Sequence, residues 1–287
     1  MLTDKFILGT ANLTTGYGIA NPKAMSIEKA RELLNTALKL GITNFDTAPA
    51  YDASEELLGD YLPKNSAINI DSKISVMTGI TAKDVINFIK CSISKVKQKN
   101  LNRVYVHNSE MLLEKEGPEI LSGLREAKAI GLIKSFGASV YDETLLLKIH
   151  EKFNDVSTFQ VPENICDRRL YFSKNVQNLS MNGIDFVVRS IFLQGLLLMK
   201  PEDIPSRMAK FRTRIEQFIL EVNQVGLSRL DCCVAYAESI PWADSILVGV
   251  YSSEQLTEIC NSNSKLETDW HDKIGTFSGE IIDPRSW

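Results

Sequence analysis

The chain has 287 residues, of which 44% are hydrophobic, and a formal net charge of −4. This is enough apolar sequence for a large buried core, and a barrel routinely uses this much chain in one domain. Lysine and arginine are scattered rather than gathered into the basic face that nucleic-acid binding usually shows, so we expect no nucleic-acid partner. No run approaches the roughly 18 apolar residues that a membrane-spanning helix needs, so we expect no membrane partner.

Cysteine usage and the first residues indicate a reducing compartment. The five cysteines show neither a CxxC pair nor the cysteine and histidine spacing of a zinc site. We therefore expect neither disulfides nor a bound metal. The start, MLTDKFILGTANL, lacks the basic region, apolar stretch and small-residue cleavage site of a signal peptide. A cytoplasmic monomer or small homo-oligomer is the simplest expectation.

Short apolar or β-branched runs alternate with helical patterns from one end of the chain to the other. The first expected strand, 6–9, is followed by a helical pattern at 26–40. Ser26 is the expected N-cap of that helix, and Gly41 stands where a C′ glycine belongs. The other expected elements are the strands 43–47, 68–74, 103–107, 133–139, 157–161, 184–190 and 246–250, and the helices 82–98 and 118–130.

The order of these elements predicts the fold. Eight strand and helix units with short connections favour a parallel sheet, and eight strands close a TIM barrel. The alternative is an open doubly wound sheet, but GTANLTTGYG after the first strand is not G-x-G-x-x-G. We therefore predict an α/β fold, a (β/α)8 TIM barrel forming a single domain over residues 1–287. Two helical patterns, 206–225 and 228–238, predict an extra helix between strands 7 and 8.

Four ionisable residues stand at or just beyond the ends of three successive strands. Asp46 ends the second strand, Tyr51 follows it past Pro49, Lys73 is near the end of the third, and His107 ends the fourth. The active site of such a barrel lies at the C-terminal ends of its strands. We therefore expect these four side chains to converge in one cleft, where they would shift one another's pKa values.

The four groups suit the reduction of a carbonyl, which needs a proton on oxygen as a hydride reaches carbon. Tyr51 would supply the proton, because the Lys73 ammonium favours the phenolate and Asp46 keeps that lysine charged. A neutral His107 would hydrogen-bond the carbonyl oxygen. Each residue alone has a simpler explanation as a turn former, packed rim residue, snorkelling lysine or core histidine. Their combination at adjacent strand ends favours the catalytic hypothesis.

The segment FDTAPAYDASEELLG at 45–59 resembles the signature of the aldo-keto reductase superfamily. The catalytic tetrad of that family then falls on Asp46, Tyr51, Lys73 and His107, in that order. The resemblance covers nearly the whole chain, from LGTANLTTGYGI near the start to GVYSSEQLTEI near the end. VPENICDRRL and VRSIFLQGLLL resemble short bacterial members, some of them linked to sugar or surface-polysaccharide pathways.

The resemblance implies a small-molecule carbonyl substrate and an NAD(P)H cofactor bound across the barrel mouth. Ser139 and Gln160 would hold the nicotinamide carboxamide, Arg189 and Ser190 would flank the pyrophosphate, and 249–258 would surround the adenosine. The cofactor residues implied in this way are Gly9, Thr10, Asp46, Ser139, Gln160, Arg189, Ser190, Gln194, Gly249, Val250, Ser252, Gln255 and Glu258. The substrate residues implied are Tyr17, Tyr51, His107, Asn108 and Phe192, with Trp287 as a further wall candidate.

The chain departs from the family pattern in ways that leave the cofactor open. Val140 stands where the family often has an asparagine that contacts the carboxamide. The segment VGVYSSEQLTEI at the end of strand 8, where NADPH-dependent members usually hold the 2′-phosphate, has no basic residue, so NADH use or weak discrimination is expected as an alternative. A clamp from Arg212 or Arg214 is a further alternative. The segment before the first strand is too short for the family's N-terminal hairpin. The short loop after strand 4 predicts an open pocket that suits a polar or extended substrate.

Two other hypotheses use the same residues. Lys73 could form a Schiff base in an aldolase, although an ion-paired lysine stays protonated and is a poor nucleophile. The chain could also be a non-catalytic, cofactor-binding regulatory subunit, as some members of the family are.

Overall fold

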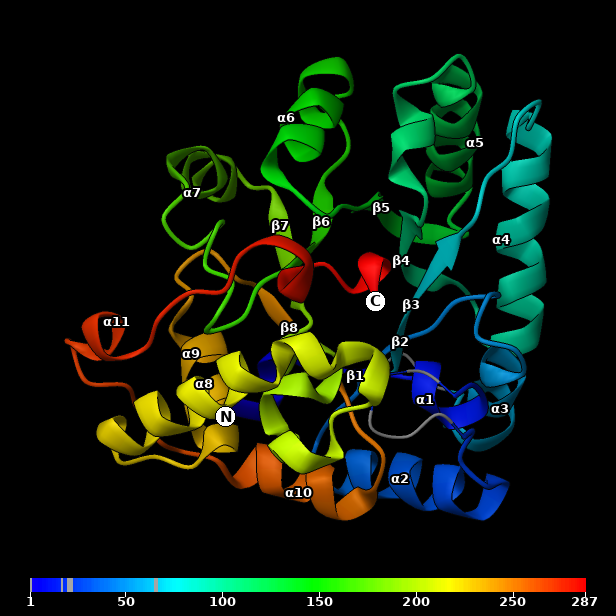
Figure 1. Cartoon of the computed structure of the whole chain (residues 1–287). Coiled ribbons are helices and arrows are strands. Elements are labelled where there is room, and N and C mark those ends of the chain that lie inside the picture. Colours follow the sequence, from blue (N-terminus) through cyan, green and yellow to red (C-terminus); the bar gives the residue numbers. More distant parts are fainter. Residues whose placement is uncertain (1, 17, 20–22, 65–66) are drawn as a thin grey trace.

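Eight parallel strands form a closed barrel in this computed structural model, which describes residues 2–16, 18–19, 23–64 and 67–287. Each strand pairs with the next, and β8 pairs with β1 to close the ring (Figure 1). The predicted TIM barrel is therefore confirmed, and the open sheet was wrong. The strands are β1 (Phe6–Gly9), β2 (Asn44–Asp46), β3 (Asn69–Ile74), β4 (Leu101–Val106), β5 (Ile133–Ser139), β6 (Thr158–Pro162), β7 (Asp185–Arg189) and β8 (Ser245–Gly249).

Helices cover the outside of the barrel (Figure 1). Within the described ranges, no helix is long and apolar enough to cross a bilayer. The α-helices are α1 (Ala11–Thr14), α2 (Ile27–Lys39), α3 (Ser54–Tyr61), α4 (Ala82–Val96), α5 (Gly117–Ala129), α6 (Glu143–Lys152), α7 (Lys174–Met181), α8 (Arg212–Val225), α9 (Arg229–Ser239), α10 (Ser253–Asn261) and α11 (Trp270–Lys273). The 3-10 turns are η1 (Leu2–Lys5), η2 (Ser109–Leu112), η3 (Leu193–Leu198), η4 (Pro201–Asp203), η5 (Ser206–Phe211), η6 (Gly279–Ile282) and η7 (Pro284–Ser286).

Two helices, α8 and α9, lie between β7 and β8, as the sequence predicted. The pattern at 206–225 begins as the 3-10 turn η5 and becomes an α-helix only at Arg212. The start of α2 also follows the prediction, because the Ser26 hydroxyl accepts a hydrogen bond from the Lys29 backbone N–H. Gly41 follows the last turn of α2 with a φ of +85°, a conformation that glycine adopts without the steric cost of a Cβ.

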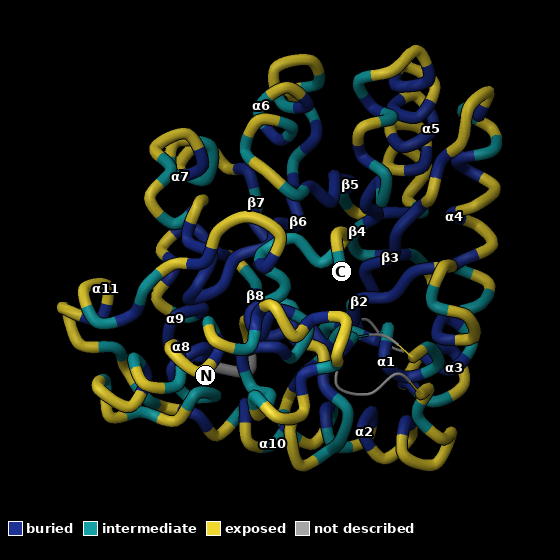
Figure 2. The backbone as a smooth tube through the Cα atoms, viewed as in Figure 1, coloured by how far each residue is buried: buried dark blue, intermediate teal, exposed yellow. Residues whose placement is uncertain are grey.

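Burial separates the strands and the inner helix faces from an exposed outer surface (Figure 2). One apolar cluster fills the layer between barrel and helices, whereas Ile7, Tyr105 and Val187 form a second, small cluster. Successive side chains on a strand point to opposite faces. The second cluster therefore marks the positions that point into the barrel: Ile7 and Gly9 on β1, Arg103 and Tyr105 on β4, and Asp185, Val187 and Arg189 on β7.

Candidate active site

The strand period brings the predicted site residues to one end of the barrel interior. Asp46 closes β2, Lys73 lies one residue before the end of β3, and Ser139 closes β5. Gln160 faces the same side on β6, since its amide reaches Asp46. His107 was predicted to end the fourth strand, but β4 stops at Val106. The His107 backbone N–H nevertheless continues the ladder by donating to the carbonyl of Ile74 at 2.9 Å.

Asp46 and Lys73 form a buried ion pair. Their side chains are 2% and 3% exposed, and the Lys73 ammonium donates to Asp46 Oδ1 and to the carbonyl of Thr47. The other carboxylate oxygen, Oδ2, accepts a hydrogen bond from Gln160 Nε2 at 2.9 Å. Burial alone would lower the pKa of Lys73, but the charge of Asp46 and the neighbouring Tyr51 outweigh it and raise the pKa. The ammonium is therefore held protonated.

Tyr51 is held by a turn after β2 rather than by a helix or strand. Its N–H donates to the Ala48 carbonyl at 2.9 Å, and its own carbonyl accepts from the Thr14 hydroxyl at 2.5 Å. Pro49, which lies between Ala48 and Tyr51, excludes a helix through this stretch. The Lys73 ammonium lies 5.2 Å from the centroid of the Tyr51 ring. The turn thus sets a phenol beside the charged end of a buried lysine.

Three buried hydroxyls support this turn from behind. The Thr47 hydroxyl donates to Ser54 Oγ, Ser54 Oγ donates to Thr10 Oγ1, and Thr10 Oγ1 donates to the Asp46 carbonyl, at 3.2, 2.7 and 2.9 Å. All three side chains are fully buried. Because an unpaired hydroxyl would be costly there, the chain of hydrogen bonds fixes how β1, β2 and α3 meet. It thereby fixes the backbone on either side of Tyr51.

His107 is half-buried on the cavity wall. Burial lowers the pKa of its imidazole, and the nearby Lys73 ammonium lowers it further. Asp46 opposes these effects, but the net direction is downward. The ring is therefore neutral near pH 7, and it can donate one N–H hydrogen bond to a ligand without carrying charge.

A cavity of about 960 Å³ opens at this end of the barrel. All four residues of the expected tetrad line it, together with Phe192 from the expected substrate set. The expected cofactor residues that line it are Gly9, Thr10, Asp46, Ser139, Gln160, Arg189, Ser190, Gln194, Gly249, Val250, Gln255 and Glu258. One cavity therefore joins the four residues expected to be catalytic to the residues expected to bind the cofactor.

Three expected site residues do not line the cavity. The Ser252 hydroxyl caps α10 by accepting from the Gln255 N–H. The Asn108 side chain holds the backbone just beyond β3, since it accepts from Val76 N–H and donates to Val76 O at 3.0 and 2.7 Å. Trp287 packs against Phe211. A fourth, Tyr17, lies outside the described residues.

The loop after β7 has an unusual backbone where it borders the cavity. Ser190, Leu193 and Gln194 have φ values of 62°, 49° and 54°, in the left-handed region that non-glycine residues rarely adopt. Asp52, next to Tyr51, has a φ of 50°. Each such residue costs about 1–3 kcal/mol, and such residues cluster at ligand-binding sites. Two of them, Ser190 and Gln194, line the cavity.

Several buried polar atoms on the cavity wall have no hydrogen-bond partner within the part of the chain that the structure describes. They include Gln160 Oε1, Asn12 Oδ1 and Arg189 Nε. Gln160 and Asn12 are 1% and 6% exposed, so these acceptors are poorly placed to reach bulk water. A ligand rich in donors and acceptors would satisfy them. The donor set, the cavity size and the neutral imidazole all fit a nicotinamide dinucleotide.

The cavity wall also includes residues that the sequence did not indicate. Asn12 and Tyr141 stand just beyond β1 and β5, so inspecting every strand end could have found them. Lys200 follows η3 and Arg229 begins α9, and the fold alone brings them to this wall. By contrast, neither of the two arginines expected as alternative phosphate ligands lines the cavity. Arg212 donates to the carbonyls of Pro201 and Ile204, and Arg214 pairs with Glu221.

Comparison with known proteins agrees with this architecture. The model of the aldo/keto reductase family matches residues 5–276. The uncharacterized oxidoreductase YqkF of Bacillus subtilis (strain 168) is 24% identical over 277 residues, which cover 88% of each chain. A thermostable aldo-keto reductase solved with the inhibitor epalrestat superposes with a TM-score of 0.71, at 24% identity over 93% of each chain.

A second solved structure, the holo form of an aldo-keto reductase from Bacillus halodurans, gives a TM-score of 0.74 at 16% identity. The alignment covers 97% of this chain and 94% of that one. At such low identity these two structures show the shared fold. The family match spans nearly the whole chain, and the protein therefore belongs to the aldo/keto reductase family of oxidoreductases.

Proposed function

We propose that this protein is an NAD(P)H-dependent carbonyl reductase that converts an aldehyde or ketone, a sugar or sugar derivative among the candidates, to the alcohol. The observation that carries the proposal is the position of the Tyr51 phenol beside the buried Asp46–Lys73 pair and near the neutral His107, all on one cavity wall. These groups combine a phenol, a buried ammonium paired with a carboxylate, and a neutral imidazole on one wall.

The chain's own residues supply the proton and the orientation. Tyr51 would transfer its phenolic proton to the carbonyl oxygen as a new C–H bond forms at carbon. A free phenol has a pKa of about 10, so the phenolate left behind needs the stabilisation that the Lys73 ammonium offers. His107 would donate a hydrogen bond to the same oxygen and set its angle. When bound, NAD(P)H supplies the hydride.

The unsatisfied atoms on the wall suggest how the cofactor would be held. Ser139 and Gln160 would bind the carboxamide, since Gln160 Oε1 has no partner within the described residues while its Nε2 is committed to Asp46. Arg189, Ser190 and Gln194 would lie along the pyrophosphate, and the segment from Gly249 to Glu258 would surround the adenosine. Val140 cannot replace the family's asparagine, because its side chain lacks a donor.

Two basic residues offer the cofactor phosphate contacts that the segment after β8 lacks. Arg229 donates from Nη1 to the carbonyls of Leu197 and Met199, at 3.2 and 2.6 Å, which fixes its guanidinium in the wall. Burial lowers the pKa of Arg229, and within the described ranges no carboxylate lies within 4 Å of it. Lys200 is an exposed neighbour on the same wall. A phosphate would balance these charges, so we expect NADPH to bind more tightly than NADH.

The Schiff-base hypothesis fits this geometry poorly. An aldolase lysine must lose its proton to attack a carbonyl. The pKa of Lys73 is raised, because Asp46 and Tyr51 outweigh the effect of its burial, so the neutral amine is scarce at pH 7.

Cofactor titration followed by intrinsic fluorescence tests the proposal, with carbonyl-dependent loss of cofactor absorbance as the second readout. We expect the wild-type protein to bind both dinucleotides, to prefer NADPH, and to oxidise it when an aldehyde is added. Arg229→Met should weaken NADPH binding about tenfold and NADH binding much less. The exposed Arg125 on α5, which pairs with Asp155, provides the control Arg125→Met. Failure of the wild-type protein to bind either dinucleotide would refute the proposal.

A further inference from the structure

Two arginine side chains lie against the ring of one cavity residue, Tyr141. The guanidinium carbon of Arg285 is 4.0 Å from the ring centroid, and that of Arg189 is 4.4 Å away. Tyr141 and Arg189 line the cavity, whereas Arg285 comes from the C-terminal end of the chain. In Figure 1 this end lies over the middle of the barrel. Segments almost 150 residues apart in sequence thus meet at the mouth.

The Arg285 guanidinium is held rigidly but keeps part of its donor capacity. Its Nε and Nη2 donate to the two oxygens of Asp283, at 2.9 and 2.8 Å. This bidentate bond and the contact with Tyr141 fix the plane of the group. Its side chain is 50% exposed, and Nη1 makes no hydrogen bond within the described residues. A planar donor fixed in this way, with two free N–H groups, is suited to an oxyanion.

Arg189 extends the positive charge from the rim toward the reaction centre. It donates to Ser190 Oγ and to the Val140 carbonyl, and no carboxylate lies within 4 Å of it in the described part of the chain. It is near enough to His107 to contribute to lowering the pKa of the imidazole, after burial and Lys73. His107, Arg189, Tyr141 and Arg285 therefore mark a path from the carbonyl position to the rim.

We propose that the substrate is an anionic carbonyl compound whose carboxylate or phosphate binds Arg285 at the rim while its carbonyl lies between Tyr51 and His107. This inference rests on the proposed reductase function and narrows its substrate class. The Tyr141 ring contacts both guanidiniums, so it links Arg285 at the rim to Arg189, the residue that we assign to the cofactor pyrophosphate. The anion would accept from Nη1, which makes no hydrogen bond within the described residues.

A purely structural role for Arg285 is the competing explanation, because the C-terminal segment has other anchors. Trp287 lies 6.1 Å from Phe211 between ring centroids, and Glu280 forms an ion pair with Lys210. If Arg285 only fastened this segment, its loss would lower thermal stability and affect all substrates alike. If it binds an anion, its loss changes the selectivity between charged and neutral substrates.

Matched substrate pairs make this distinction. We would measure kcat/KM for 4-oxobutanoate against butanal, and for glyceraldehyde 3-phosphate against glyceraldehyde, with wild type, Arg285→Gln and Arg285→Lys. The wild type should prefer the charged member of at least one pair, and Arg285→Gln should reduce that preference at least tenfold. Whether the carboxylate or the phosphate pair responds identifies the anion. Arg285→Lys, which keeps the charge, should restore part of the preference even if both variants lose the same thermal stability.

Arg125→Gln is the matched control, since Arg125 is also about half exposed, at 51%, and also makes a bidentate bond to an aspartate. Among the described residues that line the cavity Arg125 is absent, so its loss should leave both ratios unchanged. Reduction of neutral aldehydes with no preference for either anion would overturn this inference while leaving the proposed function intact. If no carbonyl is reduced at all, the proposed function fails. In that case, fluorescence titration of the cofactor-bound protein with 4-hydroxybutanoate and with 1-butanol still tests whether Arg285 binds an anion. Equal affinity for the charged and the neutral alcohol would overturn the inference.

Discussion

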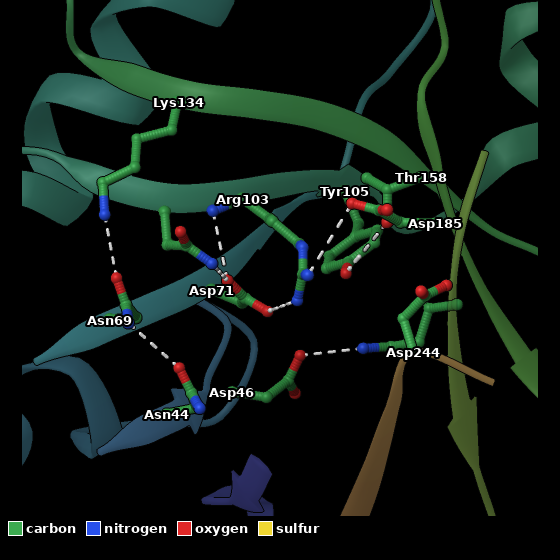
Figure 3. A network of polar contacts seen from close by, with 12 residues as sticks. Asn44, Asp46, Asn69, Asp71, Arg103, Tyr105, Lys134, Thr158, Asp185 and Asp244 are labelled. Carbon is green, nitrogen blue, oxygen red and sulfur yellow. Dashed lines mark hydrogen bonds and ion pairs between the residues drawn. The ribbon is translucent and has the colours of Figure 1, made fainter. Parts of the chain in front are cut away.

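The two ends of the barrel interior hold two buried ion pairs that share one strand. On β3, Asp71 pairs with Arg103 at 3.3 Å toward the base, and Lys73, two residues later, pairs with Asp46 at the mouth. Figure 3 shows the ion pair between Asp71 and Arg103, with Asn69, Tyr105 and Thr158 around it. Both pairs have one fully buried carboxylate, so burial of charge alone does not distinguish a structural pair from a reactive one.

The difference lies in the neighbouring atoms. At the base, Asp71 also accepts from Asn102 and from the Arg103 backbone, at 2.8 and 3.1 Å, and Arg103 extends to the half-exposed Asp185. The Asp71 carboxylate thus forms its hydrogen bonds with groups of the protein itself. At the mouth, Gln160 Nε2 donates to Asp46, while Gln160 Oε1 has no hydrogen-bond partner among the described residues, and Gln160 lines a large cavity. Access and unused hydrogen-bonding capacity are therefore the features that support our proposal that the mouth is the reactive end.

The largest expected contrast is between Tyr51, in the turn beyond β2, and Tyr105, inside the barrel. Tyr51→Phe removes the assigned general acid, and we expect kcat to fall about thousandfold, within the range typical of such groups. Cofactor affinity should change less than about threefold, because the hydroxyl is assigned to the substrate. Tyr105→Phe is the matched change on β4, where the phenol is fully buried near Thr158 and does not line the cavity. Steady-state kinetics of both variants test this. An equal loss of activity in Tyr51→Phe and Tyr105→Phe would contradict the assignment of Tyr51 as the general acid.

The cations of the two ion pairs, Lys73 and Arg103, give the next contrast. Lys73→Met and Arg103→Met each leave a buried aspartate without its cation, which costs about 3–5 kcal/mol in the free energy of unfolding. Only Lys73→Met should also reduce kcat of the folded protein, by about a hundredfold, because the phenolate loses its cation. Urea unfolding and kinetics on the same preparations separate the two effects. If the fully folded Arg103→Met variant lost kcat, the ion pair between Asp71 and Arg103 would also contribute to catalysis.

A smaller effect is expected for the pH dependence of His107. Burial and Lys73 lower the pKa of its imidazole from 6.5, so kcat/KM should stay level as pH falls through 6.5 and decline only below it. His107→Gln keeps an N–H donor but cannot titrate, so it should lower kcat/KM about tenfold and remove that acid limb. A wild-type limb centred at or above 6.5 would argue against a neutral imidazole in the free enzyme.

The smallest effect concerns stability at the base. Burial raises the pKa of Asp71 above 3.8, outweighing the nearby Arg103 and Asn102. The folded state then binds this proton more tightly than the unfolded state, so stability falls as pH rises from 3.8 through the raised pKa. Asp71→Asn lacks this proton, and its stability relative to wild type should therefore increase with pH across that window. Denaturant unfolding at several pH values gives the trend, and a difference independent of pH would rule out the proton linkage.

The sequence predicted the fold because strand and helix periods are local properties. Each of the eight expected strands overlaps an observed one, and Asp46 and Lys73 fall on inward positions through the two-residue period alone. Residues in loops and at helix starts were not predictable in this way. Lys200, Arg229 and Arg285 reach the cavity region only because the long β7–β8 connection and the C-terminal segment return to the mouth. Asn108 is the opposite case. The sequence placed it among the substrate residues, but its side-chain amide is hydrogen-bonded to the Val76 backbone.

The most direct test of the central claim is a single turnover with NADPH already bound. Mixing the complex with an excess of carbonyl substrate should consume the nicotinamide absorbance and release one alcohol per cofactor oxidised in wild type and Tyr105→Phe. In Tyr51→Phe the bound cofactor should persist. Borohydride added to a parallel sample without cofactor should leave Lys73 unmodified. Cofactor that stays reduced in the wild-type protein, or a borohydride-trapped adduct on Lys73, would contradict carbonyl reduction at the mouth of this barrel.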